Sequence, residues 1–149
     1  LKNMAYYNNT KIVKNSTSSY FIKLLRAVVL ETNYTGPKVK IEGYEIGGKT
    51  GTAELRNESG QYQKDVNMTS FIGVFPISKP KYVVLAMIEN PKKIIEENYS
   101  ITGATVAAPL VKSIILRMIE ILGISLPNSS EILKADTSIK YQNINNATF

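Results

Sequence analysis

Apolar residues recur along the chain at two different spacings, and these spacings distinguish expected helices from expected strands. Five of them after Ser18 fall at the three- and four-residue intervals of a helix face: Phe21, Leu24, Leu25, Val28 and Val29. The same spacing follows Pro109, which suits a first helical turn, and it stops before Gly123. The pattern predicts one helix capped by Ser18 that runs to about Leu30, and another from Pro109 to Leu122.

Between these helices the pattern changes to short runs of β-branched and aromatic residues. The run at 69–75 is stopped by Pro76 and the run at 81–89 by Pro91, and the four residues 77–80 lie between Pro76 and the second run. This arrangement predicts two antiparallel strands joined as a hairpin. A third strand is predicted ahead of them, starting at Val39 or Tyr44 and ending at Ala53, and a polar loop is predicted at 56–64.

The order helix, three strands, helix favours an α+β fold in which helices flank an antiparallel sheet, because no crossover helix separates the strands. Residues 1–17 are predicted to be a polar lead-in and residues 128–149 a weakly ordered tail, with the folded part at 18–127. Two helices and three strands make a thin core for 149 residues, and the chain does not begin with Met. We therefore expect it to be part of a larger domain.

Composition excludes several kinds of chemistry. The chain contains no Cys and no His, which excludes disulfides, thiolate nucleophiles, zinc fingers and a Ser-His-Asp triad, and no metal or cofactor is expected. The net charge of +6 comes from scattered pairs of basic residues, a pattern that argues against nucleic-acid binding. The longest apolar run, at 82–88, is too short to cross a bilayer, so we expect the chain itself to be soluble.

The most unusual stretch is Gly-Gly-Lys-Thr-Gly-Thr-Ala-Glu at 47–54, where three glycines interrupt a predicted strand. Interior glycines weaken strands, so they indicate that a ligand or another backbone approaches closely. Alternation places Thr50 and Thr52 on one side of the strand and Lys49 on the other. Such an edge offers hydroxyls, a cation and free main-chain groups to a peptide that ends in a carboxylate. A glycine-rich surface strand without a ligand is the plainer alternative.

The segment Lys-Thr-Gly-Thr-Ala at 49–53 resembles the third signature motif of penicillin-binding proteins and serine β-lactamases. Three more segments resemble a class B penicillin-binding protein in the same order and spacing, above all the division-specific septal peptidoglycan transpeptidase: SFIGVFP, YVVLAMIENP and GATVAAPLVKSI. The resemblance covers roughly residues 18–127. It implies the C-terminal half of a β-lactamase/transpeptidase-like fold.

The resemblance also implies an activity and roles for the motif. In the family, a serine attacks the penultimate D-alanine carbonyl of a stem peptide, and an amine from a neighbouring strand then attacks the acyl-enzyme to form a cross-link. Lys49 would help to hold the donor carboxylate, and Thr50 and Thr52 would hydrogen-bond that group or its β-lactam equivalent. Gly51 would let the ligand backbone lie close, and the backbone N–H of Thr52 would donate to the oxyanion.

Partners and location follow from the same resemblance. The partners would be peptidoglycan stem peptides, β-lactam antibiotics, division-complex proteins and the upstream half of the same domain. The parent protein would lie at the periplasmic face of a bacterial inner membrane. In the parent fold the strand at 81–89 would pair on its far side with strands absent here, so this chain alone is expected to self-associate through an open edge.

The nucleophile of the family is not found. No Ser-x-Asn triplet exists, and the one Ser-x-x-Lys string begins at Ser78, in the predicted hairpin turn, and contains Pro80. The family places its nucleophile upstream of the motif at 49–52, at the start of a helix. We therefore interpret Ser78 as a turn residue, and we predict that the chain alone is inactive.

Two other readings stay open on sequence grounds: half of a serine β-lactamase, and a non-catalytic peptide-binding or surface module. Eight Asn-x-Ser/Thr triplets are compatible with a surface glycoprotein, although an Asn-rich composition accounts for part of that number. The carboxylates Glu54, Glu96 and Glu97 are expected to face solvent. Tyr44 and Tyr82 are expected to be packing residues.

Overall fold

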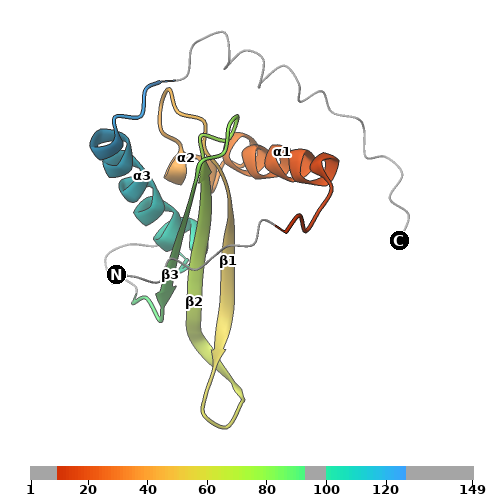
Figure 1. Ribbon diagram of the computed structural model, residues 1–149. Helices are drawn as coiled ribbons and strands as arrows, with labels where there is room; N and C mark the ends of the chain where they lie inside the picture. Colours follow the sequence, from red (N-terminus) through yellow and green to blue (C-terminus); the bar gives the residue numbers. More distant parts are fainter. Residues whose placement is uncertain (1–9, 93–99, 127–149) are drawn as a thin grey trace, which may run out of the picture.

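The computed structural model describes residues 10–92 and 100–126, and its architecture is the predicted α+β arrangement (Figure 1). Three strands form one antiparallel sheet in the order β1-β2-β3. The elements are α1 (Asn15–Glu31), α2 (Gly36–Val39), β1 (Gly47–Arg56), β2 (Tyr62–Phe75), β3 (Tyr82–Glu89), the π-helical turn η1 (Gly103–Ala107) and α3 (Ala108–Leu122). The predicted boundaries of the lead-in and the tail stay predictions, since residues 1–9 and 127–149 lie outside the described ranges.

The first helix begins earlier than predicted. The backbone N–H of Ser18 donates to the carbonyl of Lys14 at 3.0 Å, so Ser18 lies inside the first turn and the prediction that it caps the helix was wrong. The predicted apolar face is covered only in part. Leu25 and Val29 are buried, whereas Phe21 is 58% exposed.

The first strand begins later than predicted, because the residues ahead of it fold differently. Residues 36–39 form the single turn α2, and the N–H of Tyr44 closes another turn on the carbonyl of Ile41 at 3.2 Å. Val39 and Ile41 are nevertheless buried in the core. These two residues are therefore apolar because they are buried in the segment between α2 and β1, and this segment is not part of a strand.

The β1–β2 hairpin is longer than predicted and projects beyond the helices (Figure 1). Strand pairing continues to Arg56 and Tyr62, so the polar loop expected at 56–64 shrinks to a turn. The guanidinium of Arg56 lies 4.5 Å from the centre of the Tyr62 ring and donates to its hydroxyl at 2.8 Å. The backbone N–H of Gln61 donates to the Asn57 side chain at 2.8 Å. These cross-strand contacts stabilise pairing without an apolar pattern.

The last helix agrees closely with its sequence signals. Pro109 lies in the first turn of α3, and Gly123 ends the helix in the left-handed region at φ 59° with its N–H on the carbonyl of Ile119. Val111 and Ile115 are fully buried against the sheet. Gly73 of β2 makes room for this helix, since a Cβ there would lie 2.9 Å from a methyl group of Val111.

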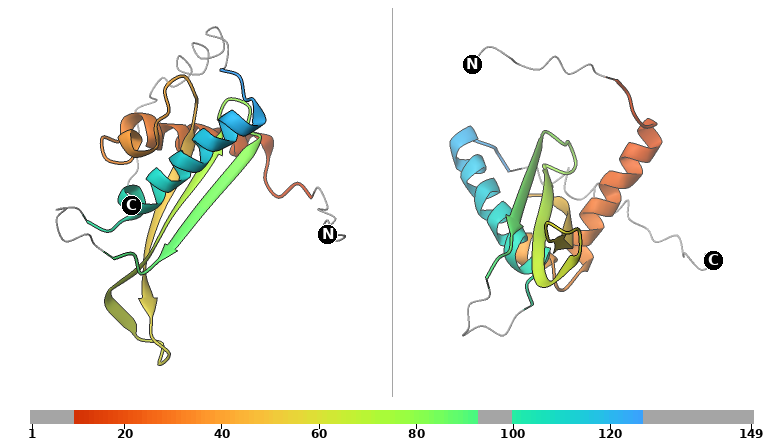
Figure 2. Two further views of the ribbon diagram at one scale, coloured as in Figure 1. Left: turned by 90° about the vertical axis from the view of Figure 1, so that its left-hand side faces the viewer. Right: turned by 90° about the horizontal axis from the view of Figure 1, so that it is seen from below.

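The two long helices lie on opposite sides of the sheet (Figure 2). The main core forms under α3, where Phe71, Phe75 and Ala86 of the sheet meet the buried face of the helix. On the other side a smaller cluster joins Val74 of β2 to Leu25 of α1. The helices thus cover one face well and the opposite face only at one end.

The rest of that opposite face is apolar and uncovered by any residue that the structure describes. The strand register and the alternation of side chains place four apolar residues together there. They are Ile72 (37% exposed), Val83 (64%), Leu85 (55%) and Met87 (57%). We call these four residues the open face. β3 is also the outer strand of the three described, which confirms the predicted unpaired edge.

We expect the isolated chain to self-associate through the open face and the β3 edge, because exposed apolar surface next to unpaired strand groups favours contact between copies. Sedimentation velocity should show a sedimentation coefficient that rises with concentration, and Leu85→Lys should abolish that rise. Ile121→Lys is the matched control, since Ile121 is 80% exposed on α3. A wild-type chain that stays monomeric at high concentration would contradict this prediction.

Candidate functional site

The glycine-rich motif occupies one edge of the described sheet. β1 pairs with β2 only, in a register that places Lys49 opposite Ile72 and Thr52 opposite Thr69. Within residues 10–92 and 100–126, the outer side of β1 has no strand beside it. The motif therefore has the edge geometry that addition of a peptide strand requires.

The glycines ahead of the lysine serve packing inside the protein. A Cβ on Gly48 would lie 2.4 Å from the Phe71 ring, and one on Gly47 would lie 2.5 Å from a methyl group of Ile77. Both glycines are buried. The sequence argument that bare backbone signals a ligand therefore does not apply to them, because neighbouring side chains occupy the space.

Gly51 also lies against a side chain of the neighbouring strand, and its own backbone lies against Gly103. A Cβ on Gly51 would lie 2.5 Å from the Ser70 hydroxyl, and a Cβ on Gly103 would lie 2.7 Å from the carbonyl oxygen of Gly51. The Ser70 side chain therefore occupies the space beside Gly51, and the close approach of a second backbone requires the glycine at 103, not the one at 51. A ligand backbone at Gly51 stays a prediction.

Lys49 is exposed, and β1 places it on the same side of the sheet as the open face. Its ammonium donates to the carbonyl of Thr50 at 2.8 Å and lies 3.5 Å from the Thr50 hydroxyl. Both acceptors belong to the next residue along the same strand. An anionic group that reaches this edge would thus meet a cation that forms no ion pair with the residues at 10–92 and 100–126.

Thr52 lies on the opposite side of β1 from Lys49, and its hydroxyl contacts the segment that leads into α3. The N–H of Gly103 donates to the Thr52 hydroxyl at 3.1 Å. The sequence analysis did not identify Gly103 as part of this site. The signal that could have found it is the run of small residues ahead of Pro109, which lets a helix start lie close to a strand.

Ser78 lies far from the motif. It belongs to the β2–β3 hairpin, past the end of β2, whereas Thr52 pairs with Thr69 in the middle of that strand. The six residue-to-residue steps from Thr69 to Phe75 alone span about 20 Å at 3.3 Å per step. The interpretation of Ser78 as a turn residue agrees with this placement.

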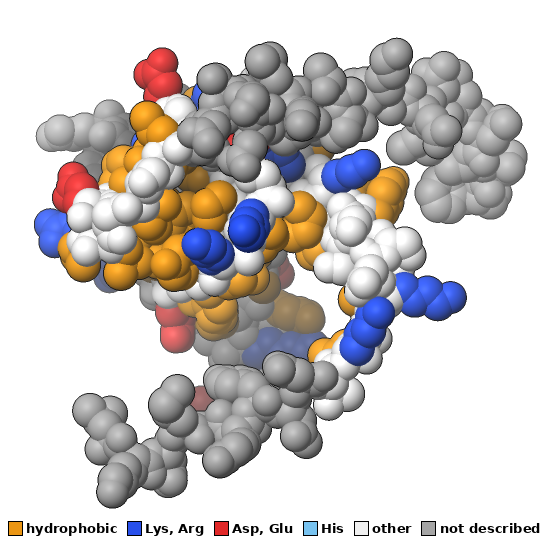
Figure 3. Space-filling view, turned by 45° about the horizontal axis from the view of Figure 1, so that its top comes forward, with side chains coloured by type: hydrophobic (Ala, Val, Ile, Leu, Met, Phe, Trp, Pro, Cys, Tyr) orange, Lys and Arg blue, Asp and Glu red, His pale blue; other side chains and the backbone are white. Residues whose placement is uncertain are grey.

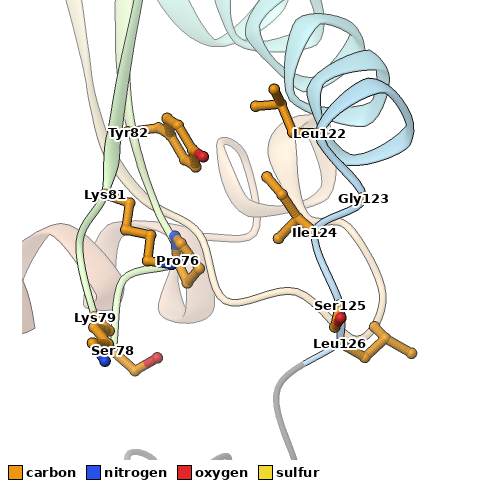
Figure 4. Close-up of a pocket in the computed structure, with 10 residues that line it drawn as sticks. All are labelled: Pro76, Ser78, Lys79, Lys81, Tyr82, Leu122, Gly123, Ile124, Ser125 and Leu126. Carbon is orange, nitrogen blue, oxygen red and sulfur yellow. The ribbon is translucent and has the colours of Figure 1, made fainter.

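The hairpin that carries Ser78 forms one wall of a cavity of about 490 Å³ (Figure 4). Pro76, Ser78 and Tyr82 lie on the strand side, and Leu122 and Ile124 lie on the side of α3. The cavity lies at the opposite end of the sheet from Thr52, so it does not form part of the candidate site.

The remaining sequence candidates are structural or solvent-exposed. The Tyr44 hydroxyl donates to the carbonyl of Ile124 at 3.0 Å, and the rings of Phe75 and Tyr82 lie 5.3 Å apart, so both tyrosines are packing residues as predicted. Glu54 is exposed. Glu96 and Glu97 lie outside the described residues.

On the face shown in Figure 3, Lys and Arg side chains are spread among apolar and uncharged groups and form no continuous basic patch. No described helix is long and apolar enough to cross a membrane.

Comparison with known proteins gives the motif a context. Residues 4–116 match the family described as the penicillin binding protein transpeptidase domain. The chain is 38% identical over 112 residues to a peptidoglycan D,D-transpeptidase FtsI homolog of Chlorokybus atmophyticus. It is 36% identical over 132 residues to stage V sporulation protein D of Bacillus subtilis. These matches cover 74% and 89% of this chain but only 15% and 18% of the two relatives.

Solved structures show the same likeness in three dimensions. Penicillin binding protein 3 of Mycobacterium tuberculosis, in complex with ampicillin, matches 78% of this chain with a TM-score of 0.64 and 31% identity. The transpeptidase domain of the FtsI4 D,D-transpeptidase of Legionella pneumophila matches 74% with a TM-score of 0.61 and 26% identity. The match spans 26% of the first structure and 38% of the second.

Proposed function

This chain belongs to the penicillin-binding protein transpeptidase family, and on that premise we propose that it forms the C-terminal part of a serine-type peptidoglycan D,D-transpeptidase that cross-links stem peptides in septal wall synthesis and binds β-lactams. The observation that carries the proposal is the Lys-Thr-Gly-Thr segment at 49–52 on an unpaired edge strand. Because the chain spans less than a fifth of the lengths of the two relatives compared above, the activity is proposed for the longer protein.

The proposed chemistry divides between this edge and a serine elsewhere in the protein. The serine oxygen attacks the penultimate D-alanine carbonyl, the terminal D-alanine leaves, and an amine of a second stem peptide attacks the resulting ester and releases the serine. Lys49 attracts the carboxylate of the donor peptide, and the hydroxyls of Thr50 and Thr52 donate to it. The Thr52 N–H donates to the oxyanion, and Gly51 lets the peptide lie close.

The proposed partner for the open face is the upstream half of the same domain. This face is apolar and lies on the side of the sheet to which Lys49 points. Family members are much longer than this chain, so a large part of the domain is available to cover it. A nucleophile carried by that half would then lie near Lys49.

Cellular context is proposed on the same basis. We assign the longer protein to the periplasmic face of a bacterial inner membrane, where its substrate is assembled, in contact with division proteins. The relatives include both an FtsI homolog and a sporulation protein. A role in septal wall synthesis, as opposed to sporulation, is therefore a separate step of the proposal.

The proposal is tested by intact-mass spectrometry after incubation with benzylpenicillin. Two samples are compared: the chain alone, and a grafted protein in which the chain replaces the matching segment of the Bacillus subtilis stage V sporulation protein D. We expect a stable single adduct on the grafted protein and none on the chain alone, because the nucleophile lies in the upstream part. Slow release of the adduct indicates a penicillin-binding protein, and fast release indicates a β-lactamase.

Two results would overturn the proposal. A grafted protein that unfolds cooperatively, and is therefore folded, but takes up no penicillin would show that the edge at 49–52 does not support acylation. An adduct on the chain alone would place a nucleophile within these 149 residues and would revive Ser78 as a candidate.

A further inference from the structure

The turn that leads into α3 lies unusually close to the candidate site. A Cβ on Gly103 would lie 2.3 Å from the carbonyl oxygen of Ser70, 2.7 Å from that of Gly51 and 3.1 Å from the N of Gly51. A real Cβ atom essentially never lies within 3.0 Å of such an atom, so the first two distances exclude a side chain at this position unless the backbone shifts. Gly103 therefore lets the start of η1 lie directly against β1 and β2 where the motif and its neighbouring strand meet.

Hydrogen bonds hold this turn in one conformation. The N–H of Thr102 donates to the Thr105 hydroxyl at 3.0 Å, and the N–H of Thr105 donates back to the Thr102 hydroxyl at 3.3 Å. The Thr105 hydroxyl in turn donates to the carbonyl of Ser100 at 2.6 Å. Such a reciprocal cap fixes the direction in which the next N–H, that of Gly103, points.

That N–H points at the motif. It donates to the Thr52 hydroxyl across 51 residues of sequence. A hydroxyl has one proton to donate and two lone pairs to accept. Within the described ranges the Thr52 hydroxyl makes no other hydrogen bond. Because Gly103 occupies one lone pair, the proton of an exposed hydroxyl stays available to an acceptor outside the chain.

We propose that Gly103 is a positioning residue for the reaction: its N–H holds the Thr52 side chain in the rotamer that donates to the bound ligand, and its missing Cβ lets the turn support the Gly51 backbone. The inference rests on the proposed function and extends it to a residue outside the motif. Under the proposed function, the acceptor is the carboxylate of the bound ligand, to which the Thr52 hydroxyl donates. Gly103 itself does not touch the ligand.

A purely structural role is the competing explanation. Gly103 is buried, and a buried N–H needs an acceptor whether or not a ligand binds. Under that explanation Thr52 serves only to satisfy Gly103. The two explanations differ in whether the effect of changing Gly103 on acylation depends on the Thr52 hydroxyl.

A double-mutant cycle on the penicillin acylation rate of the grafted protein separates them. We expect Gly103→Ala to slow acylation by about 10²-fold, the loss that a misplacement of about 1 Å can cause. In a Thr52→Val background the same change should slow acylation by less than about 3-fold, because the hydroxyl that Gly103 positions is already gone. Equal effects of Gly103→Ala in both backgrounds would overturn the proposal, and so would an unchanged rate in the single variant.

Gly123→Ala is the matched control. It is the same change at a glycine that ends α3, where a Cβ meets open space but φ is 59°. It should lower the thermal midpoint and leave the acylation rate unchanged. A comparable slowing in this control would mean that lost stability alone explains the effect, and the proposal would fail.

A second variant keeps the test informative if Gly103→Ala does not fold. Thr105→Val preserves side-chain shape and removes the hydrogen bonds through which the Thr105 hydroxyl holds Thr102 and Ser100. We expect a smaller slowing of acylation, about 10-fold, that again disappears in the Thr52→Val background. Persistence of that slowing would contradict the inference. A wild-type graft that takes up no penicillin would instead refute the proposed function.

Discussion

Acylation of the grafted protein by benzylpenicillin is expected to fall about 10³-fold when Lys49 is replaced by alanine. A lysine ammonium about 4 Å from a ligand carboxylate contributes on the order of 4 kcal/mol at the effective dielectric constant of a protein surface. If that attraction is fully developed in the transition state, its loss corresponds to about three decades in rate. Single-turnover acylation followed by mass spectrometry measures the effect directly.

Fold stability should not change in that variant. Lys49 is exposed, and its ammonium contacts only the neighbouring Thr50 in the described part of the chain. Lys79→Ala is the control, because Lys79 is an exposed lysine of the β2–β3 hairpin at the far end of the sheet. Acylation unaffected by Lys49→Ala, or slowed equally by the control, would remove Lys49 from the site.

Phe71→Ala should cost about 3–5 kcal/mol of unfolding free energy, the range measured for large aromatic residues removed from protein cores. Phe71 is fully buried in the central strand, and its ring lies so close to Gly48 that a Cβ there would be 2.4 Å from it. Its removal leaves a cavity beneath α3 beside the motif. Since small domains are stable by about 5–15 kcal/mol, this loss is a large fraction of the total stability.

Urea denaturation of the chain followed by circular dichroism gives the comparison, with Ile72→Ala as its partner. Ile72 is the next residue of the same strand, but it points to the open face and is 37% exposed. We expect Ile72→Ala to lower the free energy of unfolding by less than about half as much as Phe71→Ala. The reason is that a partly exposed side chain loses less transfer free energy and leaves a smaller cavity when it is truncated. Equal losses in the two variants would show that the core does not lie under α3.

Several elements could be predicted from local sequence because local forces decide them. Proline and glycine mark the start and end of α3, and β-branched runs followed by prolines mark β2 and β3 with the hairpin between them. These signals act within a few residues, so a single sequence contains them. The strand position of the motif and the opposite directions of Lys49 and Thr52 follow from alternation in the same way.

Other features were missed because long-range contacts override weak local signals. The extension of the β1–β2 hairpin depends on Arg56 meeting Tyr62 across the ladder. No side chain caps the N-terminus of α1, so the sequence contains no signal that predicts a start ahead of Ser18. Val39 and Ile41 have apolar character typical of a strand, yet they are buried in a turn region whose backbone folds before β1 begins.

The sequence by itself determined the order of elements, the family resemblance and the residues Lys49, Thr50, Gly51 and Thr52 as the candidate edge. Only the tertiary structure decided why the glycines are there. Phe71 and Ile77 occupy the space beside two of them, and the Ser70 hydroxyl occupies the space beside the third. The physical reason is that close packing and the N–H···O bond from Gly103 to Thr52 join segments 51 residues apart, and no local periodicity encodes such a distance.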